Sequence, residues 1–222
     1  MKAVVIANGE IEGEDLLVNE ISPDAMIVCA DGGAVNALVL GLSPHVVIGD
    51  LDSLSPELRY ELEMEGAEFI THPPQKDETD TELALRYCVA RGAESILFVG
   101  ALGGRLDHTL ANLLLLAEPT WRSMPVRIVD GRSTIELCSS RCDVSGRAGD
   151  IVSLLPYGGD VKGVCTKGLE YPLNDETLFF GPARGISNVM LDDHAAITVK
   201  DGLLLVIHYQ KVETDGLSHV AR

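Results

Sequence analysis

Basic residues are scarce in this chain of 222 residues. Lysine and arginine number 17 against 34 aspartates and glutamates, which gives a formal net charge of −17 and an isoelectric point near 4.6. Nucleic acids and anionic membrane surfaces bind clustered Lys and Arg, so this charge balance argues against either as a partner. A phosphorylated substrate would need divalent cations to offset the repulsion. Clusters of acidic residues are therefore candidate metal ligands.

Long apolar runs are also missing. The amino terminus has one short apolar run, from Ala3 to Ala7, and the core of a signal peptide is longer. No later stretch approaches the roughly 18 apolar residues of a membrane span. The five cysteines are scattered without a Cys-x-x-Cys pair, which is typical of a reducing compartment rather than of a disulfide framework or a zinc site. We therefore expect a cytoplasmic protein with structural cysteines.

Two nucleotide-binding signatures are absent. The chain has no Gly-x-x-x-x-Gly-Lys-Ser/Thr loop and no Gly-x-Gly-x-x-Gly after its first apolar run. Neither a P-loop nor a dinucleotide-binding motif is supported, which argues against hydride transfer.

The first part of the chain alternates apolar runs with helical patterns. Unalternating apolar runs suit strands buried on both faces of a parallel sheet. The spacing of Thr81 to Arg91 and of Leu110 to Ala117 suits crossover helices. We predict a three-layer α/β domain with a mostly parallel sheet over residues 1–129, with strands at Ala3 to Ala7, Ala25 to Ala30, Val46 to Ile48, Phe69 to Thr71, Ile96 to Val99 and Val126 to Val129.

After residues 130–133 the pattern changes to short β-rich runs separated by turn residues. Convincing helical periodicity is absent there, so a small all-β sandwich is predicted over residues 134–222. Residues 216–222 resemble a frayed tail. The expected strands are Ile151 to Leu155, Leu178 to Phe180, Ala195 to Val199 and Leu203 to Tyr209.

Polar and glycine-rich residues follow the predicted strands of the α/β domain. Ligands of open α/β sheets bind outside the carboxyl ends of the strands, so these segments are candidate binding residues. They are Asp31-Gly32-Gly33, Gly49-Asp50-Leu51-Asp52-Ser53, Pro73-Pro74-Gln75-Lys76-Asp77-Glu78-Thr79-Asp80 and the segment from Gly100 to His108.

Four aspartates in these segments are candidate magnesium ligands. A structural explanation exists for each, because Asp is common in turns and Thr79 with Glu82 forms a capping-box pattern at the start of a helix. All four nevertheless project from one edge of the sheet, where their repulsion is costly unless a cation lies among them. We therefore predict a metal site formed by Asp50, Asp52, Asp77 and Asp80.

The segment Gly103-Gly104-Arg105-Leu106-Asp107-His108 has the features of an anion site. Its glycines permit close backbone approach, a helix start offers N–H groups, and Arg105 can bind phosphate oxygens through two N–H groups. The alternative is a flexible loop with a capping Asp. His108 can equally cap or pack, and Lys76 can equally contact phosphate or remain a solvated charge.

Taken together, these segments resemble the thiamine pyrophosphokinase family. The order and spacing of the four strand-end segments match, and the second domain agrees through Gly168-Leu169-x-Tyr171-Pro172-Leu173, Leu178, Gly181 and Gly185-Ile186-Ser187-Asn188. The resemblance spans nearly the whole chain. It implies transfer of a pyrophosphoryl group from ATP to the hydroxyl of thiamine, with Mg²⁺ as cofactor. It also implies a homodimer whose active sites lie between the α/β domain of one subunit and the β domain of the other.

The resemblance also assigns roles to residues. Asp50, Asp52, Asp77 and Asp80 would surround magnesium and the triphosphate, and Arg105 and Asp107 would serve the nucleotide and its phosphates. Ser187 and Asn188 would contact thiamine. Further ligand contacts are expected from Asp31, Gly32, Gly33, Gln75, Lys76, Thr79, Gly104 and His108.

Three other functions remain open on the residues alone. A pyrophosphokinase for another heteroaromatic alcohol, such as a hydroxymethylpterin, could use the same α/β domain. A metal-dependent phosphohydrolase could use the same acidic clusters to activate water. A non-catalytic sensor would bind nucleotide or thiamine without turnover.

Overall fold

The computed structural model describes residues 1–211, and the expected tail at residues 216–222 lies outside them. The chain divides into two compact units, Met1–Leu137 and Cys138–Arg222. Within residues 1–211, no helix is both long and apolar enough to cross a membrane.

Unit 1 is built on a mostly parallel sheet in the order β7-β6-β5-β1-β2-β3-β4. Six neighbouring strands are parallel, and β7 is antiparallel to β6. The strands are β1 (Lys2–Ile6), β2 (Met26–Ala30), β3 (Val46–Gly49), β4 (Glu68–Thr71), β5 (Ser95–Val99), β6 (Val126–Asp130) and β7 (Ser133–Cys138). The six strands predicted for this unit are confirmed.

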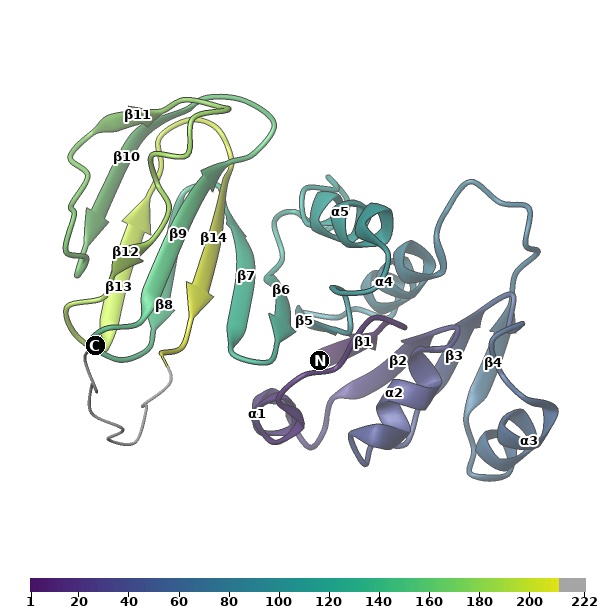
Figure 1. Ribbon diagram of the computed structural model, residues 1–222. Helices are drawn as coiled ribbons and strands as arrows, with labels where there is room; N and C mark the ends of the chain where they lie inside the picture. Colours follow the sequence, from purple (N-terminus) through teal and green to yellow (C-terminus); the bar gives the residue numbers. More distant parts are fainter. Residues whose placement is uncertain (212–222) are drawn as a thin grey trace, which may run out of the picture. The chain divides into compact units, whose positions relative to one another are not determined.

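Helices cover both faces of this sheet. In Figure 1, α1, α2 and α3 lie on one face and α4 and α5 on the other, which confirms the three-layer prediction. The helices are α1 (Glu14–Glu20), α2 (Gly33–Val39), α3 (Pro56–Met64), α4 (Asp80–Ala90) and α5 (Leu106–Leu115). Helix α5 begins four residues before the predicted start at Leu110, so Asp107 and His108 belong to its first turn.

The core of unit 1 explains why the central strands read as continuous apolar runs. Val5 and Phe98 are fully buried, as are Cys29 and Cys88. Burial raises the pKa of the Cys88 thiol to about 12 and raises that of Cys29 further, so both are protonated at neutral pH. They act as small apolar core residues, as the sequence predicts.

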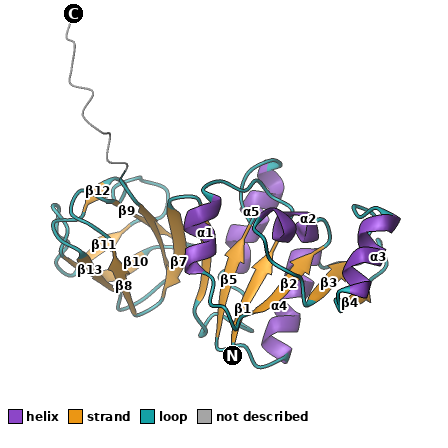
Figure 2. Ribbon diagram, turned by 90° about the horizontal axis from the view of Figure 1, so that it is seen from below, coloured by secondary structure: helices purple, strands orange, loops and turns teal. Residues whose placement is uncertain are grey.

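Unit 2 is a sandwich of antiparallel strands, and Figure 2 labels β8 to β13 among them. One sheet has the order β12-β9-β14 and the other β11-β10-β13-β8. Inward side chains of both sheets, such as Leu154 and Ile197, form one apolar core. The strands are β8 (Arg141–Ser145), β9 (Ile151–Pro156), β10 (Val161–Lys167), β11 (Glu176–Leu178), β12 (Asn188–Val189), β13 (His194–Thr198) and β14 (Leu204–Tyr209).

The strand predicted at Leu178 to Phe180 lies earlier in the chain. Strand β11 ends at Leu178, and Phe179 and Phe180 are exposed beyond it. The backbone N–H of Phe180 donates to the Asp160 carboxylate instead of a strand partner (2.9 Å).

Unit 2 contains a buried carboxylate with several hydrogen-bond partners. Asp150 is 3% exposed, and its carboxylate accepts hydrogen bonds from the backbone N–H groups of Arg147 (2.9 Å) and Lys211 (2.8 Å). It also contacts Nε2 of the buried His208 at 2.9 Å. Burial alone would raise the pKa of Asp150, but these hydrogen bonds together hold the pKa below its usual value.

Replacing Asp150→Asn is therefore expected to lower the free energy of unfolding by about 1–3 kcal/mol at pH 7. Because the pKa is depressed in the folded state, this stabilisation exists above the unfolded pKa of about 3.9 and disappears as the pH falls through the folded value. Urea unfolding at pH 7 and near pH 3 measures both points. Asp143→Asn, at the exposed ion pair with Arg141, is the matched control and should cost less than about 1 kcal/mol. A deficit in the Asp150 variant that is independent of pH would contradict the explanation.

Candidate active site

A cavity of about 780 Å³ lies at the carboxyl ends of the parallel strands of unit 1. Its walls come from the residues after five strands that are neighbours in the sheet order β5-β1-β2-β3-β4. This is where ligands of open α/β sheets bind. The lining includes residues 8–10 after β1, Asp31 after β2, Asp50, Asp52 and Ser53 after β3, Pro74, Lys76 and residues 78–81 after β4, and Gly100, Ala101 and residues 103–105 after β5, with His108 and Asn112 of α5.

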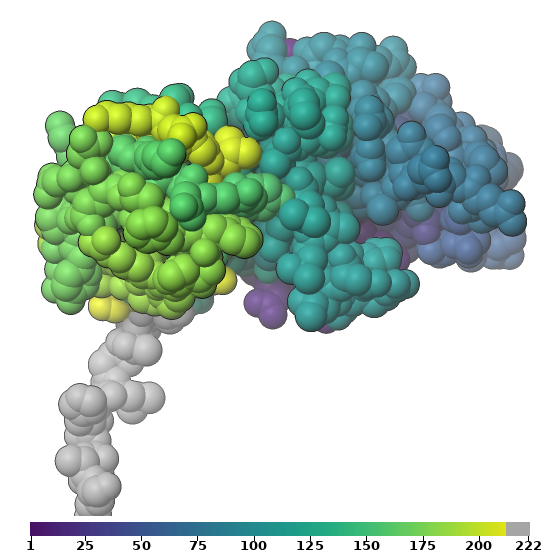
Figure 3. Space-filling model, turned by 90° about the horizontal axis from the view of Figure 1, so that it is seen from above, coloured from purple at the N-terminus to yellow at the C-terminus, as the bar shows by residue number. Residues whose placement is uncertain are grey.

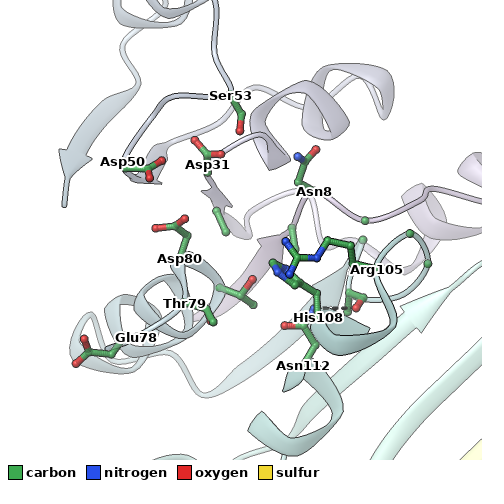
Figure 4. A pocket seen from close by; sticks show the side chains of 18 of the residues that line it. Asn8, Asp31, Asp50, Ser53, Glu78, Thr79, Asp80, Arg105, His108 and Asn112 are labelled. Carbon is green, nitrogen blue, oxygen red and sulfur yellow. Dashed lines mark hydrogen bonds between the residues drawn. The ribbon is translucent and has the colours of Figure 1, made fainter. Parts of the chain in front are cut away.

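Three carboxylates meet on one wall of the cavity. One oxygen each of Asp31, Asp50 and Asp52 lies within 4.8 Å of the others. Figure 4 shows Asp31 and Asp50 directed toward each other, with Asp80 nearby. Asp31 is 9% exposed, and its buried Oδ1 has no hydrogen-bond partner among the described residues. An unpaired buried carboxylate oxygen is costly, so this wall is suited to a cation.

The chemistry of this set fits a divalent metal ion. Carboxylate oxygens are the ligands that Mg²⁺ and Ca²⁺ take in proteins. The short connection after β3 brings two of them together, because Leu51 adopts a left-handed conformation (φ 65°) between Asp50 and Asp52. Asp31 itself has φ 44°, and its backbone N–H donates to the carbonyl of Ile48 in β3 (2.8 Å). These local conformations place the carboxylates of two adjacent strands at one point.

Asp80 belongs to the same wall but already has a cationic partner. The ammonium of Lys76 lies 3.0 Å from Asp80 Oδ1, and the Lys76 side chain is only 12% exposed. Asp80 is the first residue of α4, and the hydroxyl of the preceding Thr79 accepts the N–H of Glu82 (3.1 Å). The Thr79 half of the capping box is thus present, while the Glu82 carboxylate pairs with Arg86. This cap fixes where α4 starts and so aims Asp80 into the cavity.

The opposite wall carries an arginine and a histidine. Arg105 and His108 face the cavity across from the aspartates in Figure 4. Two guanidinium nitrogens of Arg105 donate to the Asp107 carboxylate, at 3.1 and 2.6 Å. Hydrogen bonding by Arg105 lowers the pKa of Asp107 to about 2. The cavity therefore has an acidic wall for a cation and a cationic wall for an anion, as a metal–polyphosphate ligand requires.

The structure brings together most of the α/β-domain residues singled out in the sequence. Those that line the cavity are Asp31, Asp50, Asp52, Lys76, Thr79, Asp80, Gly104, Arg105 and His108. Those that do not line it are Gly32, Gly33, Gln75, Asp77 and Asp107.

Four of the five residues outside the lining have a visible structural setting. A Cβ on Gly33 would lie 2.0 Å from the carbonyl oxygen of Ile6, so this glycine allows α2 to start against β1. Gln75 and Asp77 are exposed in the loop after β4, where Glu78 lines the cavity instead. Asp107 acts on the site through its ion pair with Arg105.

The two predicted thiamine contacts lie in unit 2. Asn188 is 8% exposed, and its amide makes three hydrogen bonds within the unit: Oδ1 accepts the N–H groups of Tyr171 and Val189, and Nδ2 donates to the Tyr171 carbonyl. It therefore holds the segment that carries Tyr171. Ser187 is exposed, with a left-handed backbone (φ 58°) whose N–H donates to Ser153.

Several lining residues were not predicted as site residues, among them Asn8, Glu10, Glu78 and Asn112. Asn8 and Glu10 follow β1, and applying the strand-end rule to the first strand would have found both. Glu78 lies within a segment already singled out. Asn112 reaches the cavity from the second turn of α5 and donates to the Ala101 carbonyl (2.8 Å), which no short-range pattern indicates.

The fold and this cavity define a two-unit protein whose α/β unit has, at its strand ends, an acidic wall suited to a cation across from an arginine suited to an anion. Two family models match the chain: "Thiamin pyrophosphokinase, catalytic domain" over residues 17–128 and "Thiamin pyrophosphokinase, vitamin B1 binding domain" over residues 139–204. The first alone covers half of the chain. The chain belongs to the thiamine pyrophosphokinase family, as its motifs predict.

Individual relatives agree with this assignment. The thiamine pyrophosphokinase of Bacillus subtilis is 27% identical over 179 residues, which cover 80% of this chain and 84% of the relative. The crystal structure of thiamin pyrophosphokinase from Geobacillus thermodenitrificans has 25% identity and a TM-score of 0.83, and covers 96% of this chain and 99% of that one. The crystal structure from Bacillus subtilis, at 24% identity and a TM-score of 0.85 over 96% of this chain and 100% of that one, agrees in fold.

The low pKa of Asp107 can be measured directly. In a pH titration followed by carboxyl NMR, we expect Asp107 to remain mostly ionised near pH 3, because Arg105 stabilises its charged form. In Arg105→Gln the pKa should rise toward the ordinary value of about 3.9. An Asp107 carboxyl that titrates at the same pH in both proteins would show that the ion pair does not form in solution.

Proposed function

We propose that this protein transfers the pyrophosphoryl group of ATP to the hydroxyl of thiamine, giving thiamine diphosphate and AMP. The observation that carries the proposal is the cavity of unit 1, in which the carboxylates of Asp31, Asp50 and Asp52 lie across from Arg105 and His108. The family to which the chain belongs supports the same reaction. The match of unit 2 to the vitamin B1 binding domain supports thiamine as the acceptor.

The reaction exchanges one P–O bond for another. The thiamine hydroxyl oxygen bonds to the β-phosphorus, the bond from that phosphorus to the α–β bridging oxygen breaks, and AMP leaves with the bridging oxygen. The protein forms no covalent bond, so its contribution is orientation and neutralisation of charge. Arg105, Lys76 and His108 line the cavity and can hold the phosphate oxygens in place.

Mg²⁺ is the proposed cofactor. Bound by Asp31, Asp50 and Asp52, it would offset charge on the triphosphate. Asp31 takes a place in this set because its carboxylate, rather than that of the exposed Asp77, lies beside Asp50 and Asp52.

Asp80 is the proposed carboxylate for the hydroxyl of thiamine. It faces the cavity beside the acidic wall, and its ion pair with Lys76 holds its orientation. In this position it can orient the hydroxyl and accept the proton that the hydroxyl loses when the new bond forms.

A homodimer is the proposed assembly, with each active site shared between the α/β unit of one subunit and the β unit of the other. Both units expose large apolar side chains. Helix α5 presents Leu106, Leu110 and Leu114, which are 51–71% exposed and spaced at i, i+4 and i+8 along one face. In Figure 3 the teal segment that contains α5 lies at the surface. Unit 2 exposes Tyr171, Phe179, Phe180, Ile186 and Leu191. A cytoplasmic location is part of the proposal, supported by cysteines that are scattered along the chain without a Cys-x-x-Cys pair.

The function is tested by incubating the purified protein with thiamine, ATP and magnesium and quantifying AMP and thiamine diphosphate. Equal yields of the two products, both absent without thiamine, are expected. Nucleotide cleavage that ignores thiamine would identify a hydrolase. Magnesium-dependent ATP binding without turnover would identify another acceptor or a sensor.

Asp50→Ala and Asp80→Ala are each expected to lower kcat by at least about 100-fold, because each removes a charge from the reacting site. Circular dichroism and thermal unfolding should show an intact fold. Asp15→Ala, at an exposed position of α1, is the control and should retain wild-type turnover. Substantial turnover in either cavity variant would remove that residue from the site.

The dimer is tested by sedimentation velocity. The wild type should sediment as a dimer, and Leu110→Asp should shift it toward monomer with loss of thiamine diphosphate formation, because a charge on an apolar contact face opposes association. Leu16→Asp, at an exposed leucine of α1, is the control and should remain dimeric. An active wild-type monomer would contradict the shared site.

A further inference from the structure

Glu10 connects the residues after β1 to the glycine loop after β5. Its backbone N–H donates to the Leu102 carbonyl (3.1 Å), and the preceding Gly9 donates to the Gly100 carbonyl (2.8 Å). Its side chain then reaches further along the same loop, where Oε1 accepts the backbone N–H of Gly104 (3.1 Å). The residues after β1 and those after β5 thus stay hydrogen-bonded to each other beyond the ends of the two strands. The last of these hydrogen bonds is made by the Glu10 side chain.

The shape of the loop depends on this side chain as well. Gly103 and Gly104 both have left-handed backbones, with φ 83° and 59°. A Cβ built on Gly103 would lie 2.8–2.9 Å from Cβ, Cγ and Cδ of Glu10, so the Glu10 side chain packs flat against the Gly103 backbone. Glycine leaves the most backbone freedom of any residue, so the conformation of this pair must be held from outside. Glu10 supplies both a packing contact and a hydrogen bond.

Arg105 is the next residue of the chain. It occupies the N-cap position of α5, where its side chain makes no capping hydrogen bond. Its guanidinium is held by Asp107 at one end, and its backbone position is set by Gly103 and Gly104 at the other. The direction of the main cation of this wall therefore depends on Glu10.

The negative charge of Glu10 opposes the binding of an anion in the cavity. Glu10 itself lines the cavity, and a carboxylate beside a polyphosphate repels it. Any favourable effect of Glu10 on anion binding must therefore come from geometry rather than from its charge.

We propose that Glu10 is a positioning residue for ATP: its carboxylate holds Gly103 and Gly104 in the conformation that directs Arg105 at the phosphates. The proposal rests on the proposed function and adds to it a residue that acts through Arg105.

The test uses two measurements on the full chain. Titration calorimetry gives the affinity for α,β-methylene ATP in the presence of magnesium, and steady-state kinetics give the KM for thiamine. Glu10→Ala should weaken nucleotide binding about tenfold, as expected for losing one well-placed charge-assisted contact. The KM for thiamine should change less than about twofold, because Glu10 acts on the nucleotide side alone. Glu10→Gln keeps a carbonyl oxygen for the Gly104 N–H and should restore wild-type affinity. Glu12→Ala, at the exposed acidic residue two positions later, is the control and should bind as the wild type does.

A double-mutant cycle with Arg105→Ala tests the route of the effect. If Glu10 acts through Arg105, Glu10→Ala should weaken binding less than about twofold in the Arg105→Ala background. Unchanged or tighter binding in Glu10→Ala, failure of Glu10→Gln to restore it, or independent multiplication of the two effects would each overturn the proposal. A wild type that binds the nucleotide but forms no thiamine diphosphate would refute the proposed function, while the affinities would still decide the role of Glu10.

Discussion

Repulsion among carboxylates at the carboxyl edge of the parallel sheet is the constraint on which the rest of the site depends. Asp31, Asp50 and Asp52 converge there, and Asp31 leaves a buried oxygen without a hydrogen-bond partner among the described residues. In a chain of net charge −17, surrounding charges add to the cost instead of relieving it. The fold tolerates this because the sheet beneath, with side chains such as Val5 and Phe98 fully buried, is rigid enough to hold the carboxylates in place.

The few cations of the cavity are each held by a carboxylate. Lys76 pairs with Asp80, and Arg105 pairs with Asp107. Such pairs contribute little to stability where they are exposed, as Arg105 and Asp107 are. Their effect is to keep long side chains in one orientation, which reduces the entropy lost when an anion binds. The acidic composition thus serves two purposes at this site, since some carboxylates bind a cation and others position the basic side chains.

Much of this architecture could be predicted because its causes are local. Continuous apolar runs predict the six parallel strands, and Thr79 indicates the start of α4. Other features depend on contacts between distant segments. Asn188 follows a family motif, yet its amide is used by Tyr171, seventeen positions away. Likewise Asp31 rather than Asp77 completes the carboxylate cluster, because that depends on left-handed conformations at Asp31 and Leu51. L-residues seldom adopt that conformation, and composition does not reveal it.

The most direct test of the central claim, that the carboxylate cluster is destabilising until a cation occupies it, is thermal unfolding of the wild type and Asp50→Asn with EDTA and with Mg²⁺. The account predicts that Mg²⁺ raises the midpoint of the wild type. In EDTA, the unfolding midpoint of Asp50→Asn should be a few degrees higher than that of the wild type, which corresponds to about 1 kcal/mol of relieved repulsion. Mg²⁺ should raise the midpoint of this variant little. A wild type indifferent to Mg²⁺, together with an Asp50→Asn variant that is less stable in EDTA, would contradict it.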